Sequence, residues 1–177
     1  HAGYIYSGIT AGLVYSHLEL TETVIILSPN HTGIGPRCSV MTEGSWETPF
    51  GEIGIDQKFS KKLLKMSSLF KADKLAHFGE HSIEVQLPFI QIQNKNCKFV
   101  PITMYPMELK ECQEMGEAIA KTIKSFDENA IIIASTDMTH FKSAEEAHEK
   151  DFMAIKEIEK LSPEGLSSVV REFQISM

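Results

Sequence analysis

The chain has 177 residues, of which 42% are hydrophobic and 23% are charged, as is typical of a globular domain with an apolar core. Its net charge is −7 and its basic residues are scattered, which disfavours nucleic acid and anionic membranes as partners, because both require clustered Lys and Arg. No apolar run approaches the roughly 18 residues that a membrane-spanning helix needs. We therefore expect a single domain over residues 1–177 with neither kind of partner.

The chain begins at His1 rather than at a methionine and ends on an apolar-leaning tail, so we expect it to be truncated at both ends. Three cysteines occur, widely spaced and without a CxxC pair: Cys38, Cys97 and Cys112. A sparse, odd set of this kind argues against a disulfide framework and for a reducing compartment, so we expect a cytoplasmic location.

Strand and helix patterns alternate along the chain. In order, they predict a helix over 9–18, a buried strand over 24–27, an irregular hairpin or loop over 42–55, helices over 56–69 and 82–93, a strand over 99–104, a helix over 108–125, a strand over 131–134, a helix over 143–161 and a further helix starting at 162–164. Short, continuous apolar strands separated by helices are typical of an α/β fold with a central, mostly parallel sheet flanked by helices. Pro101 inside the second strand predicts a sheet edge or a bulge there.

Two of the three predicted strands lead directly into a histidine. In open α/β sheets, sites gather at the carboxyl ends of the strands. His31 follows the first strand in SPNHTGIGP, where Gly33 and Gly35 allow unusual φ values. His140 follows the third strand in STDMTH, where Asp137 can orient an imidazole. The alternatives are a polar loop residue for His31 and a capped turn for His140.

The other five histidines differ in context. His81 lies at a helix start in GEHSIE, between two glutamates that can simply pair with the helix dipole. His1 lies before a predicted helix, where it either reaches into a cleft or has no special role. The remaining three are expected at the surface or at helix caps: His17, His77 and His148. Two neutral imidazoles and one anionic ligand can hold ferrous iron with open positions, and further histidines can move protons.

Four motifs in this order resemble the Memo family, also known as AmmeMemoRadiSam system protein B: HAGYIYSG, SPNHTGIG, GEHSIEVQLPFIQ and ASTDMTHF. The resemblance covers essentially the whole chain, and the SPNHTG loop favours a prokaryotic member. It implies a fold like that of the class III, LigB-type extradiol dioxygenases, with a metal cleft. The family label also suggests a radical-SAM protein as a partner.

The resemblance assigns a role to five residues. It implies His1 and His31 as metal ligands, and it implies His140 as the acid/base group with Asp137 in the same turn. His81 matches a cleft histidine that contacts substrate or oxygen. The third ligand in the family is a cysteine, which we expect beyond residue 177. None of the three cysteines here occupies that position, although Cys38, seven residues after His31, is an alternative.

Three functions follow from these observations. The first is an iron(II)- or copper-dependent, dioxygenase-like protein acting on a small phenolic substrate. The second is a non-catalytic module that binds a peptide or protein in the same cleft. The third is a copper-handling protein, because a soft thiolate ligand makes copper(I) credible beside iron.

Overall fold

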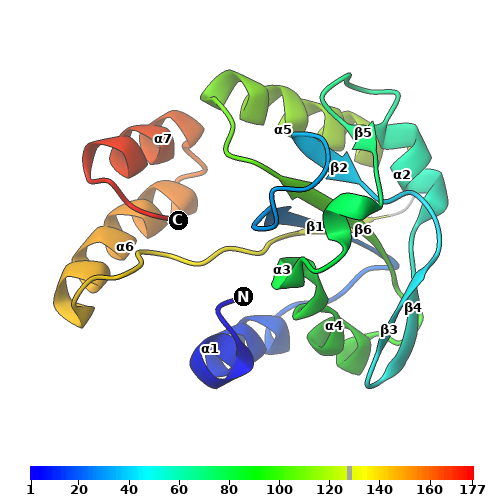
Figure 1. Ribbon diagram of the computed structural model, residues 1–177, viewed down its shortest axis with the longest axis horizontal. Coiled ribbons are helices and arrows are strands. Elements are labelled where there is room, and N and C mark those ends of the chain that lie inside the picture. The colour runs from blue at the N-terminus through cyan, green and yellow to red at the C-terminus, as the bar shows by residue number, and fades with distance from the viewer. Residues whose placement is uncertain (127–128) are drawn as a thin grey trace.

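A five-stranded sheet in the order β5-β2-β6-β1-β7 forms the centre of the computed structural model, which describes residues 1–126 and 129–177 (Figure 1). Its strands are β1 (Thr23–Pro29), β2 (Cys38–Val40), β5 (Lys71–Ala72), β6 (Lys98–Met104) and β7 (Ala130–Ala134). Strands β6, β1 and β7 run parallel, whereas β2 is antiparallel to β6. The expected α/β class with a mostly parallel sheet is therefore confirmed.

Helices cover both faces of this sheet, and two further helices lie beside it (Figure 1). They are α1 (Tyr4–Ser16), α2 (Gln57–Leu63), the 3₁₀ helix η1 (Leu75–His77), α3 (His81–Glu84), α4 (Leu87–Gln93), α5 (Leu109–Lys124), α6 (Ala144–Glu159) and α7 (Pro163–Glu172). Helices α6 and α7 pack on each other, and α7 contacts α5. Figure 1 shows this pair beside the main body, connected to β7 by a long segment.

The central strand β1 contributes to two apolar clusters because alternate side chains of a strand point to opposite faces. Ile25 packs with residues of α2 and α5 on one face. Val24 and Ile26 pack with residues of α1, α3 and α4 on the other face. All three side chains are fully buried, so β1 is covered on both sides, as its continuous apolar run predicts.

Most predicted helices are present, with shifted ends. Ser143 and Ser162 accept hydrogen bonds from the backbone N–H groups of Glu146 and Gly165, so both act as N-caps. The helix predicted over 82–93 is wrong as a single element, since α3 ends at Glu84 and α4 begins at Leu87. In a continuous helix, Pro88 would have to donate a hydrogen bond to the carbonyl of Glu84, and proline has no N–H.

Other elements also differ from the sequence-based prediction. The helix predicted over 56–69 ends at Leu63, and the helix predicted over 9–18 begins already at Tyr4. The segment 42–55, by contrast, agrees with the prediction of a hairpin or loop, since β3 (Ser45–Thr48) and β4 (Gly51–Gly54) pair in antiparallel fashion. The short strands β2 and β5 were not predicted, because two or three residues carry too little pattern to be recognised.

Pro101 lies in the middle of the sheet, so the expectation of an edge or a bulge is wrong. Strand β6 is central, and Pro101 is in register with Ile26 of β1. On its other side, β2 pairs only with Ile102–Met104, and the next contact is the hydrogen bond from Asp56 N to Phe99 O. Pro101 falls between these two contacts, where no neighbouring strand needs its missing N–H.

The carboxyl ends of the three parallel strands meet at one edge of the sheet. Pro29 of β1 is in register with Met104 of β6, and Leu27 is in register with Ala134 of β7. The backbone N–H of Ser135 donates to the carbonyl of Leu27, which continues the pairing one residue past β7. His31 and Ser135 therefore lie at the same edge of the sheet, where these strands end.

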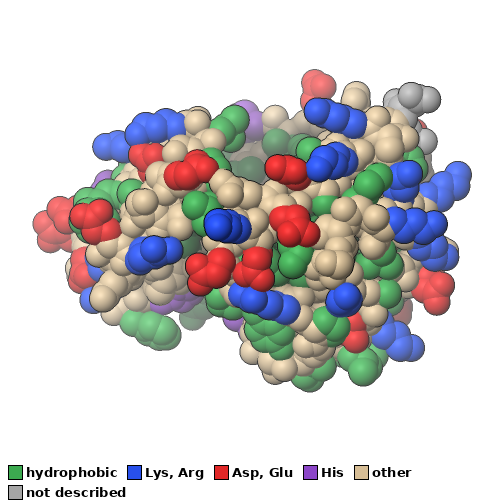
Figure 2. All heavy atoms as spheres, turned by 90° about the horizontal axis from the view of Figure 1, so that it is seen from above, with side chains coloured by type: hydrophobic (Ala, Val, Ile, Leu, Met, Phe, Trp, Pro, Cys, Tyr) green, Lys and Arg blue, Asp and Glu red, His purple; other side chains and the backbone are tan. Residues whose placement is uncertain are grey.

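Surface charge is mixed in sign. On the face shown in Figure 2, Lys and Arg side chains alternate with Asp and Glu side chains. Lys142, which precedes α6, and Lys150 of α6 both lie 3.1 Å from the carboxylate of Glu146. Within the described part of the chain, no helix combines the length and apolar character needed to cross a membrane.

The loop after β1 depends on its glycines, and Gly35 is the more constrained of the two. Gly33 and Gly35 have φ values of 73° and 89°, in the region that costs other residues about 1–2 kcal/mol. A Cβ on Gly35 would also lie 2.7 Å from the Cβ of Ala76, whereas one on Gly33 would meet nothing within 4 Å.

We expect Gly35→Ala to lower the free energy of unfolding by roughly 2–4 kcal/mol, because backbone strain and overpacking add. The matched variant Gly33→Ala should lose only the backbone contribution. Urea denaturation of both variants measures the difference. Equal losses in the two variants would contradict the importance of the contact with Ala76.

Candidate metal centre

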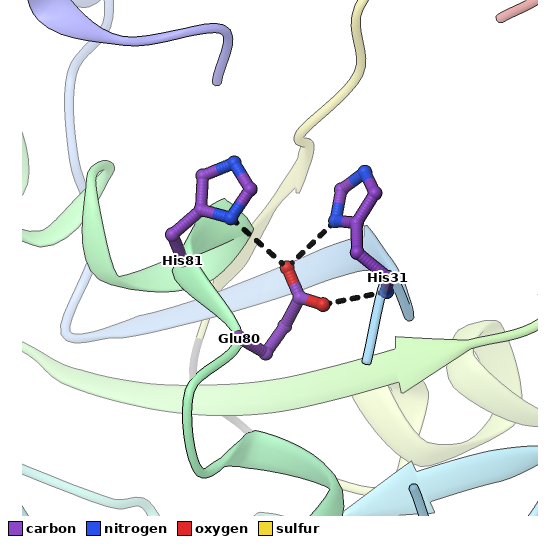
Figure 3. A group of neighbouring side chains, drawn as sticks. All are labelled: His31, Glu80 and His81. Carbon is purple, nitrogen blue, oxygen red and sulfur yellow. Dashed lines mark hydrogen bonds and ion pairs between the residues drawn. The ribbon is translucent and has the colours of Figure 1, made fainter. Parts of the chain in front are cut away.

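His31 is held at the end of β1 by the buried carboxylate of Glu80, which precedes α3. Glu80 Oε1 lies 2.9 Å from His31 Nδ1, and Glu80 Oε2 accepts a hydrogen bond of 2.6 Å from the His31 backbone N–H (Figure 3). The turn itself is closed by Asn30, whose side chain accepts from Gly33 N and donates to the carbonyl of Ile34. The contact therefore fixes both the backbone and the ring of His31.

Glu80 is ionised despite being only 2% exposed. Burial by itself would raise the pKa of this carboxyl group, but hydrogen bonds from His31 and Ser82 lower its pKa to about 2. Because the carboxylate can only accept, His31 Nδ1 carries the proton and donates it to Glu80. In the neutral ring, the lone pair then lies on Nε2 of His31.

Three imidazoles lie together at this edge of the sheet. The ring centroids of His1, His31 and His81 are separated by 5.3 Å (His1–His31), 5.7 Å (His1–His81) and 5.1 Å (His31–His81). His81 Nδ1 is 3.7 Å from Glu80 Oε1. In Figure 3, one nitrogen of His31 and one of His81 face Glu80, and the second nitrogen of each ring lies on the far side.

His1 is mostly buried, at 8% exposed, and has two polar contacts to the segment after β7. Its Nδ1 lies 3.0 Å from Ser135 Oγ. Its main-chain nitrogen lies 3.0 Å from Asp137 Oδ1. Ser135 and Asp137, which follow β7, thus hold His1 beside His31.

His140 is connected to this group through Asp137. Its Nε2 is 3.5 Å from Asp137 Oδ2, and its Nδ1 is 2.9 Å from the carbonyl oxygen of Ser176. A carbonyl can only accept, so Nδ1 carries a proton, and Nε2 is the position that can gain or lose one. The structure therefore brings His1, His31 and His81 into ring-to-ring proximity, and it places His140 on the other side of Asp137.

Metal binding is chemically compatible with this arrangement. His31, Glu80 and His81 each offer a ligand atom, and these three atoms lie within 4.8 Å of one another. Glu80 is already committed, because its oxygens accept from His31 and Ser82. The imidazoles are the free donors, and imidazole suits iron, copper and zinc.

Two residues considered from sequence lie away from this group. Cys38 is 1% exposed and packs in the core with α2 and α5, and burial raises the pKa of its thiol to about 12. It is a core side chain rather than the alternative ligand. His77, expected at the surface or at a helix cap, is 5% exposed and its ring nitrogens have no hydrogen-bond partner among the described residues, so that expectation is wrong. His17 and His148 are exposed, in agreement with the same expectation.

Sequence reasoning missed the residues that anchor the histidines. The sequence offers Glu80 as a partner of the helix dipole, and its side chain does cap α3 by accepting from Ser82 N. It also reaches across to His31, which no local pattern indicates. Ser135, Gln86 and Tyr15 were not singled out, although they form a buried hydrogen-bonded chain that ends at His1. The position of Ser135 directly after the strand predicted over 131–134 was the available signal.

Comparison with known proteins identifies the family to which the chain belongs. The model of the family described as Memo-like protein matches residues 1–177. The chain belongs to this Memo-like family.

Curated relatives of the family support the same assignment. The chain is 41% identical over 181 residues to the MEMO1 family protein MK0963 of Methanopyrus kandleri, covering 100% of this chain and 64% of the relative. It is 41% identical over 180 residues to a MEMO1 family protein of Sulfolobus acidocaldarius, covering 99% and 63%. It is also 41% identical over 178 residues to one of Aquifex aeolicus, covering 100% and 66%. The chain thus spans just under two thirds of these Memo relatives.

Proposed function

We propose that this Memo-family protein binds iron(II) or copper between His1 and His31, and that it carries out dioxygenase-like chemistry on a small phenolic substrate. The observation that carries the proposal is the contact between Glu80 and His31 Nδ1. A carboxylate that accepts from a ligand histidine fixes the ring, selects the tautomer and increases the basicity of the other nitrogen. The same arrangement can orient a general-base histidine, but the ring of His31 also lies beside a second imidazole, that of His1, with the ring centroids 5.3 Å apart, as two ligands of one metal would.

The side chains of this chain divide into binding and proton-moving groups under the proposal. His1 and His31 hold the metal, which supplies oxygen activation or redox chemistry when bound. His140 exchanges a proton at Nε2, and Asp137 stabilises its charged form from 3.5 Å. His81, half-exposed beside both ligands, would contact the substrate or oxygen.

The third ligand and the identity of the metal form a separate part of the proposal. The resemblance to the Memo family implies a cysteine thiolate as the third ligand, and we propose that it comes from outside residues 1–177. A thiolate beside two imidazoles makes copper(I) a competitor of iron(II). Anaerobic titration against a copper(I) chelator, run in parallel with iron(II) uptake, decides between an oxygenase and a copper-handling protein.

We expect His31→Ala to abolish stoichiometric metal binding, because it removes one of the two imidazoles. Metal content and anaerobic titration with iron(II) and copper(I) are the measurements. His148→Ala, which removes an exposed histidine of α6, is the matched control and should bind like the unmodified protein. Equal affinity in His31→Ala and the unmodified protein would overturn the metal site, and binding of a peptide partner that survives in His31→Ala would favour the binding module.

A further inference from the structure

Ser135 is the point at which a buried hydrogen-bonded chain meets His1. It follows β7, is 5% exposed, and is held to β1 by its backbone N–H. Its hydroxyl oxygen has three close neighbours. These are the carbonyl oxygen of Ser82 at 2.6 Å, Gln86 Nε2 at 2.9 Å and His1 Nδ1 at 3.0 Å.

The roles of these three neighbours follow from the number of hydrogens available. A serine hydroxyl has one hydrogen and two acceptor lone pairs. The carbonyl of Ser82 can only accept, so the single hydrogen of Ser135 points to it. The amide nitrogen of Gln86 donates to one lone pair. The remaining lone pair faces His1 Nδ1, which must therefore be the donor.

The far end of the chain supports the same assignment. The hydroxyl of Tyr15 donates to Gln86 Oε1 over 3.0 Å, which turns the amide nitrogen of Gln86 towards Ser135. Tyr15 and Gln86 are 4% and 7% exposed, so water does not compete readily for these contacts. Burial also raises the pKa of Tyr15, which remains a protonated donor.

We propose that Ser135 is a positioning residue that holds His1 in the Nδ1–H tautomer and so presents its Nε2 atom to the metal. The effect on metal binding rests on the proposed function, whereas the tautomer of His1 can be measured in the metal-free protein. It also makes the two ligands unequal. His31 donates to a carboxylate, whereas His1 donates to a neutral hydroxyl, so His31 gains more basicity from its partner than His1 does.

The test reads the tautomer without metal. In metal-free protein with ¹⁵N-labelled histidine, ring nitrogen shifts assigned through a His1→Ala variant should show His1 protonated at Nδ1. Ser135→Ala should populate the Nε2–H tautomer and weaken metal binding roughly 10–100-fold, as is typical for the loss of such an orienting partner. Ser135→Cys keeps a side chain of similar size but replaces the hydroxyl with a weak acceptor. It should shift the tautomer of His1 and weaken metal binding in the same direction as Ser135→Ala.

Ser28→Ala is the matched control, because Ser28 is also a buried serine whose hydroxyl contacts a carbonyl, that of Ile102. It should leave the tautomer of His1 and the metal affinity unchanged. An Nε2–H tautomer in the unmodified protein, or an unchanged tautomer in both Ser135 variants, would overturn the inference. Absence of metal binding by the unmodified protein would instead reject the proposed function, and the tautomer measurement would still decide the role of Ser135.

Discussion

Replacing Glu80 with glutamine is expected to weaken metal binding roughly 10–100-fold, the usual effect of losing a partner that orients a ligand histidine. The carboxylate accepts from the backbone and ring of His31 and from Ser82. An amide has only one acceptor oxygen and places an NH₂ group against these donors. The ring of His31 then loses its fixed tautomer and part of its basicity. We also expect a stability loss of roughly 1–3 kcal/mol from donors left unsatisfied.

Glu84→Gln provides the matched control for this prediction. Glu84 lies four residues further along and is exposed, so its replacement should change neither metal affinity nor stability appreciably. Metal affinity is measured by anaerobic titration and stability by urea denaturation in the absence of metal. If Glu80→Gln binds metal as tightly as the unmodified protein, Glu80 does not orient a ligand.

The buried His77 is expected to lower the free energy of unfolding by about 3 kcal/mol as the pH falls from 6.5 to 4. Both ring nitrogens of His77 are buried without a hydrogen-bond partner among the described residues. Its ring lies edge-on to that of Trp46, with the ring centroids 5.9 Å apart. Burial lowers the pKa of His77 from 6.5 to about 4, although Asp73 and Glu80 act in the opposite direction. One unit of pKa corresponds to about 1.4 kcal/mol.

The sign of the effect follows from proton binding. Below pH 6.5 the unfolded chain binds a proton at His77, whereas the folded protein does not do so until about pH 4. Acid therefore favours the unfolded state across this window, and stability that is fully present above pH 6.5 is lost as the pH falls towards 4. Other groups titrate in the same range, so the contribution must be isolated by comparison with a variant.

His77→Leu removes the titrating group while keeping an apolar side chain. Urea denaturation at a series of pH values should show a smaller loss of stability between pH 6.5 and 4 in this variant than in the unmodified protein. His148→Leu, at an exposed histidine, should follow the unmodified protein. Parallel pH profiles for His77→Leu and the unmodified protein would contradict a neutral, buried His77.

The sequence by itself determined the features that depend on local pattern. The apolar runs at 24–27, 99–104 and 131–134 identified the three parallel strands, because strands buried on both faces need no polar alternation. Burial on both faces holds for β1 and β6 but is wrong for β7, an edge strand in which Ile132 is 47% exposed. Ser143 and Ser162 marked their helix starts, since a cap acts within three residues of itself. The rule that sites gather at strand carboxyl ends then directed attention to His31 and to the turn after β7.

Only the tertiary structure decided which side chains meet. Glu80 lies 49 residues from His31 along the chain, and Ser135 lies 134 residues from His1, so no local pattern records either contact. Pro101 is tolerated in a central strand because β2 ends before reaching it, and His77 is buried because other segments cover it. These outcomes depend on packing between distant segments, whereas helix and strand periodicity reports only a residue's own neighbourhood.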